Sequence, residues 1–250
     1  MRVFAGPNGS GKSTIIKSVS KYQKNGRLIK FGFYINADDI AVDLQKNRFS
    51  FGFYQIQTTN EEFREVVLAS GLIGNRFTEK QFSSSYRFLS NGILLRRMNS
   101  NEALAQIIAD FLRKKMLEEK KKFSFETVFS HASKLDIMRN AQNAGYKVYL
   151  YFVCTESPEL NIERVKFRVN KDGHDVPKER IVSRYKRSLD LLYNAAQLAD
   201  RAYFFDNSGK KPVLFGSFKM EKGQKKWDEM KAEDVPNWFY EYYSLKAKRR

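Results

Sequence analysis

The feature that most constrains this chain is the segment 6–14, which reads Gly-Pro-Asn-Gly-Ser-Gly-Lys-Ser-Thr. It matches the phosphate-binding loop pattern Gly-x-x-x-x-Gly-Lys-Ser/Thr at every fixed position. Residues 2–5 before it read as a short buried strand, and residues 14–19 after it read as a helix. Because strand, glycine loop and helix are the context that this motif requires, we predict a binding site for a nucleoside triphosphate with magnesium.

The residue types in this loop fit the chemistry of a triphosphate, which needs hydrogen-bond donors that converge without steric bulk. Glycines are expected to take positive φ and to bring bare N–H groups close to phosphate oxygens. Lys12 is expected to reach the β- and γ-phosphates, and the hydroxyl of Ser13 is expected to bind Mg²⁺. The start of the following helix adds partial positive charge. The predicted nucleotide-binding residues are Gly6, Pro7, Asn8, Gly9, Ser10, Gly11, Lys12, Ser13 and Thr14.

Length and composition indicate the size of the fold and the cellular compartment. The chain has 250 residues, of which 42% are apolar, so it suits one large domain or a domain with an insertion. The longest apolar run, residues 148–154, is far too short to span a membrane. The first predicted strand leaves no room for a signal peptide, and the single Cys154 cannot form an internal disulfide. We therefore expect a cytoplasmic protein with Cys154 at a buried strand end.

The net charge of +17 raises the alternative of contact with a nucleic acid or another polyanion. The charge is spread along the chain, with concentrations at 219–231 and 246–250. No recognisable nucleic-acid-binding module accompanies it. A basic surface combined with a binding site for phosphates would explain the same net charge.

Strand-like and helix-like segments alternate along most of the chain. The strand candidates are residues 2–5, 33–36, 122–126, 148–153 and 202–205. The helix candidates are a segment capped by Ser130 that runs to about Asn143, one opened by Ser157-Pro158-Glu159, and one opened by Asp175-Val176-Pro177 that runs to about Ala199. The alternation predicts an α/β fold of the P-loop NTPase type: three layers, with a parallel five-stranded sheet between helices.

Ligands bind at the carboxyl ends of the strands in open parallel sheets, so the polar residues there are informative. A kinase needs a carboxylate that accepts a proton from the attacking hydroxyl, and Asp38 is the predicted general base. The predicted substrate-binding residues are Glu126, Thr127 and Asn36. Each carboxylate has an alternative role as a helix cap, which we favour for Asp39. For residues 206–209, Asp-Asn-Ser-Gly, a simple turn is at least as good an interpretation as a site.

Positive charge near the transferring phosphoryl group is predicted from two basic helices. Arg164 and Arg168 are four residues apart and share a helix face, and both are candidates for catalysis. The next helix carries Arg184 as a lid candidate, and the connection between the helices contains a second one, His174. Solvated arginine faces are the alternative, and we favour it for the two flanking residues, Arg180 and Arg187.

The organisation predicted from these segments is a P-loop kinase domain over residues 1–209. Residues 40–121 interrupt the alternation and are interpreted as a mainly helical insertion that covers the site. Residues 210–250 are predicted to form a hairpin around Gly223 and an aromatic helix, both packed on the same domain.

Five segments, taken in order, resemble the zeta toxin family of phosphate-loop kinases, in particular its stand-alone bacterial branch. They are residues 5–14, 34–41 (Tyr-Ile-Asn-Ala-Asp-Asp-Ile-Ala), 125–130 (Phe-Glu-Thr-Val-Phe-Ser), 173–177 (Gly-His-Asp-Val-Pro) and 184–189 (Arg-Tyr-Lys-Arg-Ser-Leu). The phosphate loop alone is generic, whereas the set in this order is fairly specific.

The resemblance implies a kinase that uses ATP or GTP as phosphate donor. Characterised zeta toxins phosphorylate the 3′-hydroxyl of UDP-N-acetylglucosamine, and the family implies an antitoxin partner. The family's catalytic aspartate falls on Asp38, its substrate-contacting glutamate on Glu126 and its first phosphate-facing arginine on Arg164 or Arg168. Its second arginine would fall near His174, where this chain has a histidine.

Other classes of phosphate-loop protein fit less well. A transporter-type ATPase needs a Leu-Ser-Gly-Gly-Gln-like signature and a strand that ends in Asp-Glu, and the sequence has neither. A GTPase is disfavoured because residues 170–173, Asn-Lys-Asp-Gly, lack the aspartate at the fourth position. A kinase or ATPase that acts on nucleic acid through the basic surface remains the alternative to a small-molecule kinase.

Overall fold

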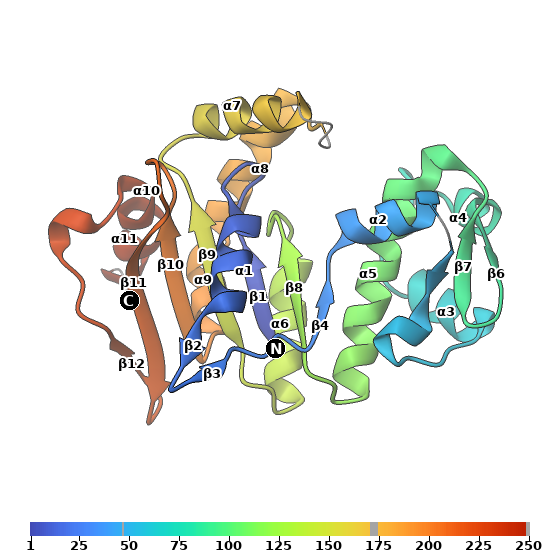
Figure 1. The fold of residues 1–250 in the computed structure, drawn as a ribbon, viewed down its shortest axis with the longest axis horizontal. Coiled ribbons are helices and arrows are strands. Elements are labelled where there is room, and N and C mark those ends of the chain that lie inside the picture. The colour runs from blue at the N-terminus through green and yellow to red at the C-terminus, as the bar shows by residue number, and fades with distance from the viewer. Residues whose placement is uncertain (47, 171–174, 249–250) are drawn as a thin grey trace. The chain divides into compact units, whose positions relative to one another are not determined.

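The computed structural model describes residues 1–46, 48–170 and 175–248. The chain divides into two compact units, and each is described by itself (Figure 1). The first unit joins Met1–Gly32 to Ser124–Arg250, and the second unit is Phe33–Phe123. The phosphate loop and the predicted basic helices therefore belong to the first unit, whereas Asp38 belongs to the second.

The main sheet has seven strands in the order β12-β11-β10-β9-β1-β8-β4. These strands are β1 (Arg2–Ala5), β4 (Phe33–Ile35), β8 (Phe123–Thr127), β9 (Tyr149–Cys154), β10 (Arg201–Asp206), β11 (Val213–Glu221) and β12 (Gln224–Trp227). The pairs β1–β8, β1–β9 and β9–β10 are parallel. The prediction of five strands is wrong in number: all five are present, and the predicted hairpin supplies two more, because β11 pairs antiparallel with β10 and β12 with β11.

Strand β9 and most of β1 are apolar, because parallel strands in this fold class are buried on both faces. Val3, Phe4 and Ala5 of β1 are fully buried, and Cys154 lies buried at the end of β9, as predicted. In Figure 1, α1 is in front of this sheet and α9 is behind it. The other elements of the first unit are α1 (Lys12–Lys21), β2 (Gln23–Lys24), β3 (Arg27–Leu28), α6 (Ser133–Asn143), α7 (Pro158–Val169), α8 (Lys178–Asp190), α9 (Leu192–Gln197), α10 (Asn237–Phe239), a π-helical turn (Tyr240–Ser244) and α11 (Leu245–Lys248).

The helix boundaries test the capping predictions. The prediction for α7 is confirmed: Ser157 is the N-cap, its hydroxyl accepts a hydrogen bond from the N–H of Leu160, and Pro158 is the first helical residue. The cap at Ser130 is wrong, because α6 begins three residues later and the ring of His131 accepts a hydrogen bond from the N–H of Ser133 instead. The helix predicted to run from 175 to about 199 is two helices, α8 and α9, which meet at Leu191.

The tail of the first unit is held by aromatic packing. The ring of Phe204 on β10 lies 4.8 Å from that of Phe239, and the rings of Phe239 and Tyr243 stack at 4.7 Å. Lys225 on β12 enters this cluster: its ammonium donates to the Tyr243 hydroxyl at 3.1 Å and lies 4.9 Å from the ring centre of Phe218. Burial lowers the pKa of Lys225 to about 8. The tail is therefore part of the unit's core.

The second unit combines helices with a small sheet of its own. Its elements besides β4 are α2 (Ala37–Lys46), β5 (Phe49–Ser50), a 3₁₀ turn (Phe51–Tyr54), α3 (Asn60–Leu68), α4 (Glu79–Ser85), β6 (Tyr86–Phe88), β7 (Gly92–Leu95), a second 3₁₀ turn (Met98–Ser100) and α5 (Asn101–Glu118). Strands β5, β7 and β6 form a three-stranded antiparallel sheet. Buried Phe51, Phe63 and Phe111 meet at ring distances of 5.1–5.7 Å and centre the core of this unit. Across the described part of the chain, no helix is both long and apolar enough to cross a membrane.

Candidate active site

The phosphate loop connects β1 to α1, and its backbone has the conformation that the motif predicts. Gly6, Gly9 and Gly11 all have positive φ, of 146°, 77° and 92°. A Cβ atom on Gly6 would lie 2.0 Å from the carbonyl oxygen of Val153, and one on Gly9 would lie 2.5 Å from that of Asn161. Glycine is therefore required for both backbone conformation and space.

Lys12 is the first residue of α1, and its side chain folds back over the loop. The residue is 7% exposed. Its ammonium donates to the carbonyl oxygens of Gly6 and Pro7, each at 3.0 Å, and lies 3.7 Å from a carboxylate oxygen of Glu126. The structure thus places two predicted site residues, from β8 and α1, together at the loop. The carbonyl partners hold the cation where a phosphate chain in the loop would meet it.

The start of α1 provides the remaining groups expected at a phosphate and magnesium site. Gly11 is the N-cap of the helix, and Ser13 and Thr14 are exposed in its first turn. Mg²⁺ usually keeps one or two protein ligands and takes its other oxygens from phosphate and water. One hydroxyl at Ser13 fits that pattern. Within the described residues, no cluster of three or more His, Cys, Asp or Glu side chains forms a metal site.

The predicted arginines differ in their surroundings. Arg184 on α8 donates to the side-chain oxygen of Asn8 in the loop at 3.3 Å, so the structure brings this lid candidate to the phosphate loop. Arg164 on α7 is half-buried and bonds the carbonyl oxygen of Gly209 at 3.5 Å, and its Nη1 atom has no hydrogen-bond partner. Arg168 is exposed. Arg187 bonds Ser183 within its own helix. The other lid candidate, His174, lies outside the described residues.

Two asparagines against the loop were not predicted as site residues. Asn161 on α7 contacts Gly9 through its backbone, and its side-chain oxygen accepts a hydrogen bond from Thr155 at 2.8 Å. Asn207, directly after β10, donates to the carbonyl oxygen of Ser10 at 2.8 Å. The sequence signal that could have marked Asn207 as a site residue is its position directly after a predicted strand. The sequence offers no such signal for Asn161, because an asparagine inside a helix belongs to no local motif.

Neutral side chains are buried at the end of β9, the strand that pairs with β1. The hydroxyl of Tyr185 donates to the carbonyl oxygen of Thr155 at 2.7 Å, which ties α8 to the end of β9. Burial raises the pKa of Tyr185 and that of the Cys154 thiol well above their usual ranges. Cys154 is therefore a neutral, packed side chain and not a nucleophile. Thr127 at the end of β8 accepts a hydrogen bond from the N–H of Phe129 at 3.1 Å, which shapes the turn after Glu126.

The predicted general base belongs to the second unit. Asp38 and Asp39 are both in the first turn of α2, and both are exposed. The side-chain oxygen of Asn36 accepts a hydrogen bond from the N–H of Asp38 at 3.0 Å, so Asn36 caps this helix. The capping role expected for Asp39 is therefore wrong: the cap is three residues earlier. The catalytic role of Asp38 stays a prediction.

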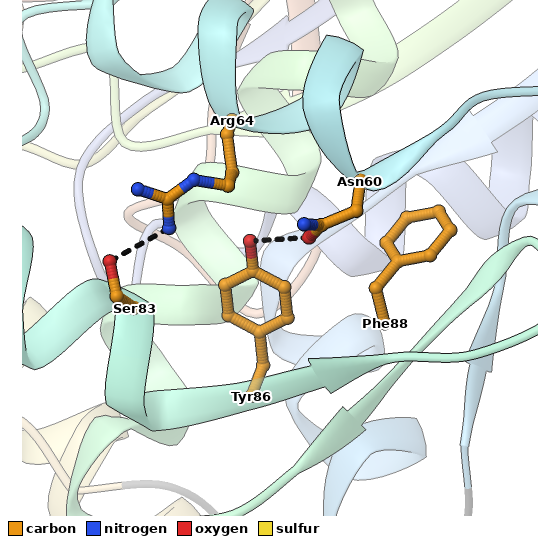
Figure 2. A pocket seen from close by; sticks show the side chains of 5 residues that line it. All are labelled: Asn60, Arg64, Ser83, Tyr86 and Phe88. Atoms are coloured by element: carbon orange, nitrogen blue, oxygen red, sulfur yellow. Dashed lines mark hydrogen bonds between the residues drawn. The ribbon is translucent and has the colours of Figure 1, made fainter.

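The second unit also contains a polar pocket of about 250 Å³, lined by Asn60, Arg64, Ser83, Tyr86 and Phe88. Figure 2 shows the Arg64 side chain joined to Ser83 and the Tyr86 hydroxyl joined to Asn60. The two hydrogen bonds are 2.8 and 3.1 Å long. Arg64 also pairs with Glu79 at 3.3 Å. The pocket thus offers polar groups in fixed orientations beside an aromatic wall.

Comparison with known proteins supports the resemblance seen in the motifs. Residues 99–216 match the family model described as zeta toxin. This range contains Glu126, Arg164, Arg184 and Asn207, and it begins after the phosphate loop and Asp38. No curated protein sequence matches the chain.

Among solved structures, a complex of AvrRxo1-ORF1 and AvrRxo1-ORF2 with sulphate ions matches with a TM-score of 0.53 at 12% identity. The match covers 90% of this chain but only 59% of that one, so this chain spans about three fifths of the relative's length. An ATP complex of the same pair matches at 0.49 and 12%, over the same shares. The PezAT toxin-antitoxin system of Streptococcus pneumoniae matches at 0.43 and 14%, over 85% of this chain and 71% of that one.

The likeness to the sulphate complex shows that the two chains share a fold. It agrees with the α/β class and the helix-covered sheet predicted from the sequence. Residues 99–216 of this chain are similar to the zeta toxin family, in agreement with the resemblance that the sequence motifs carry.

Proposed function

We propose that this chain is a zeta-toxin-type kinase that transfers the γ-phosphate of ATP or GTP to a hydroxyl group of a small molecule. One observation carries the proposal: three glycines in positive φ surround a buried lysine that is paired with carbonyl oxygens and Glu126. This is the geometry expected of a loop that binds a phosphate chain. The family match over residues 99–216 supports the choice of a kinase.

In the proposed mechanism, the loop N–H groups and Lys12 bind the β- and γ-phosphates, and the hydroxyl of Ser13 would hold Mg²⁺. Asp38 accepts the proton of the acceptor hydroxyl as its oxygen bonds to the γ-phosphorus and the bond from that phosphorus to the nucleoside diphosphate oxygen breaks. Arg184 and Arg164 offset the negative charge that spreads over the transferring group. The carboxylate of Glu126 lies 3.7 Å from the ammonium of Lys12, so in this proposal it would bind the acceptor or metal-bound water.

The proposal also concerns the identity of the acceptor molecule. UDP-N-acetylglucosamine is the first candidate because of the family resemblance. Contacts to it are proposed for Glu126, Thr127, Asn36 and the second unit. The polar pocket of that unit can be tested directly, because Arg64→Ala removes its cation whereas Arg76→Ala removes an exposed cation from the same unit. If the pocket binds the acceptor, only Arg64→Ala raises the KM for acceptor, and the KM for ATP stays unchanged.

The test of the reaction is transfer of radiolabelled γ-phosphate across a panel of sugar nucleotides, nucleosides and oligonucleotides. Wild-type protein is expected to label a small molecule, and Asp38→Ala is expected to bind ATP without transfer. Full transfer by Asp38→Ala would remove Asp38 as the base. Labelling of oligonucleotide ends, with binding that weakens steeply as salt rises, would instead favour the nucleic-acid kinase that the net charge of +17 suggests.

The family also supports two wider proposals. We place the activity in the cytoplasm, where nucleotide donors and sugar-nucleotide acceptors are available. We also propose an antitoxin protein as partner, which co-purification from the native host would detect.

A further inference from the structure

The turn after β10 reaches the phosphate loop through the side chain of Asn207. This residue is 8% exposed, and its backbone N–H donates to the carbonyl oxygen of Cys154 at 2.8 Å, which continues the pairing with β9. Its side-chain amide donates to the carbonyl oxygen of Ser10, also at 2.8 Å, across 197 residues of sequence. A Cβ atom on Gly11 would lie only 2.1 Å from the same amide nitrogen. The amide of Asn207 is therefore packed directly against the Ser10–Gly11 peptide.

The position of Asn207 is fixed from behind by its neighbours. The side chain of Asp206 accepts hydrogen bonds from the indole N–H of Trp238 at 2.9 Å and from the hydroxyl of Ser208 at 2.9 Å. The hydroxyl of Ser208 also accepts from the N–H of Glu156 at 2.8 Å. Trp238 is 2% exposed and belongs to the aromatic tail. The turn is thus held on both sides of Asn207 before any ligand enters the loop.

The bond to Ser10 has a geometric consequence for the donors of the loop. In a trans peptide, the carbonyl of one residue and the N–H of the next lie in one plane and point in opposite directions. The chain contains no cis peptide among the described residues. When the Ser10 carbonyl points at Asn207, the N–H of Gly11 must point away from Asn207. In a phosphate loop the N–H groups are the groups that bind oxygen atoms of the ligand.

We propose that Asn207 is a positioning residue of the phosphate loop, which holds the Ser10–Gly11 peptide so that the N–H of Gly11 faces a bound phosphate. The inference rests on the proposed function in one respect, namely that the loop binds a phosphate chain. It goes beyond that function because it assigns a role to a residue outside the loop motif. It also explains how the far end of the sheet, and the tail behind it, contribute to binding.

The experiment measures binding of ATP and of inorganic triphosphate to the full chain by isothermal titration calorimetry. Asn207→Ala removes the amide, and Asn194→Ala, an exposed asparagine on α9, is the matched control. Loss of one neutral hydrogen bond to the loop is expected to weaken binding of both ligands roughly 3- to 10-fold in Asn207→Ala. Asn194→Ala is expected to bind like wild type. Thermal unfolding of each variant shows whether the fold is retained.

A second variant separates positioning from a contribution to folding alone. In Asn207→Asp, the ionised carboxylate opposes the Ser10 carbonyl, whereas the protonated acid can donate to it as the amide does. The ratio of the dissociation constants of variant and wild type is therefore expected to be large at about pH 8 and to fall several-fold at about pH 5.5. A residue that only supports the fold would give a ratio independent of pH.

The outcomes distinguish this inference from the proposed function. If the wild-type chain binds neither ATP nor triphosphate, the proposed function fails and the inference fails with it. If wild type binds and Asn207→Ala binds equally well, only the inference is overturned. Should Asn207→Ala not fold, the pH dependence of Asn207→Asp decides: a constant ratio overturns the positioning role, and a ratio that falls with pH supports it.

Discussion

Replacing Lys12 by methionine tests the proposed phosphate site most directly, because the side chain keeps its length and loses only its charge. In the structure, the ammonium makes two bonds of 3.0 Å to loop carbonyls and lies 3.7 Å from Glu126. In the proposed binding mode, it would exchange these partners for phosphate oxygens. The net loss in the variant is therefore close to one charge-assisted hydrogen bond, about 1.5–3 kcal/mol. This corresponds to roughly 10- to 150-fold weaker binding of ATP.

The assay is calorimetric titration with ATP and Mg²⁺, together with urea unfolding. Lys17→Met, which removes an exposed lysine from the same helix, is the control for lost net charge. Lys12→Met is expected to unfold at a slightly lower urea concentration. The carboxylate of Glu126, which is only 17% exposed, loses the positively charged neighbour that offsets its own charge. An ATP affinity within about threefold of wild type would refute the assignment of Lys12 to the phosphates.

Three further predictions follow from local geometry. Gly9→Ala is expected to lower the melting temperature and to weaken ATP binding more than about tenfold, because its Cβ would collide with Asn161 at a φ of 77°; unchanged binding in a titration would contradict this. Arg184→Ala is expected to slow phosphate transfer at least about tenfold with little change in melting temperature, since Arg184 reaches Asn8 in the loop; an unchanged rate would exclude it from the phosphate site. Lys225→Met is expected to stabilise the fold near neutral pH, because it removes the cost of burying a charged amine. The expected gain is about 1–2 kcal/mol, a figure that is reduced because the amine is partly exposed to solvent. Burial lowers the pKa of Lys225 from 10.5 to about 8. Between these two pH values the unfolded chain binds more protons than the folded chain, so the free energy of unfolding of the wild type rises with pH. Urea unfolding on both sides of the window should show a smaller rise for the variant; equal slopes would contradict the lowered pKa.

The parts of the fold that could be predicted are those that short segments specify. The loop 6–14 was predictable because each glycine has a backbone reason to be there, and the structure shows positive φ at all three. The strand at Tyr149–Cys154 was predictable because a short, continuous apolar run is typical of a strand that is buried on both faces. The start of α7 was predictable because Ser157 and Pro158 satisfy the first turn by themselves.

The parts that could not be predicted depend on contacts between distant segments. A hairpin around Gly223 is visible in the sequence, but nothing local tells that β11 pairs with β10 and extends the sheet. The cap at Ser130 failed because His131 competes for the N–H of Ser133. Asn207 resembles any turn residue until the carbonyl of Ser10, 197 positions away, is placed beside it. The sequence predicts Asp38 as a base from its motif alone, and that prediction awaits the transfer assay.

The aromatic tail has a practical consequence for work on this protein. A shortened version that stops at residue 209, the end of the predicted kinase domain, would remove β11, β12 and the terminal helices from β10. Phe204 and its neighbours would then face water, and β10 would become an open edge ready to pair with other molecules. Such a fragment should precipitate on expression, so shortened versions of this chain should keep the strands and helices that follow residue 209.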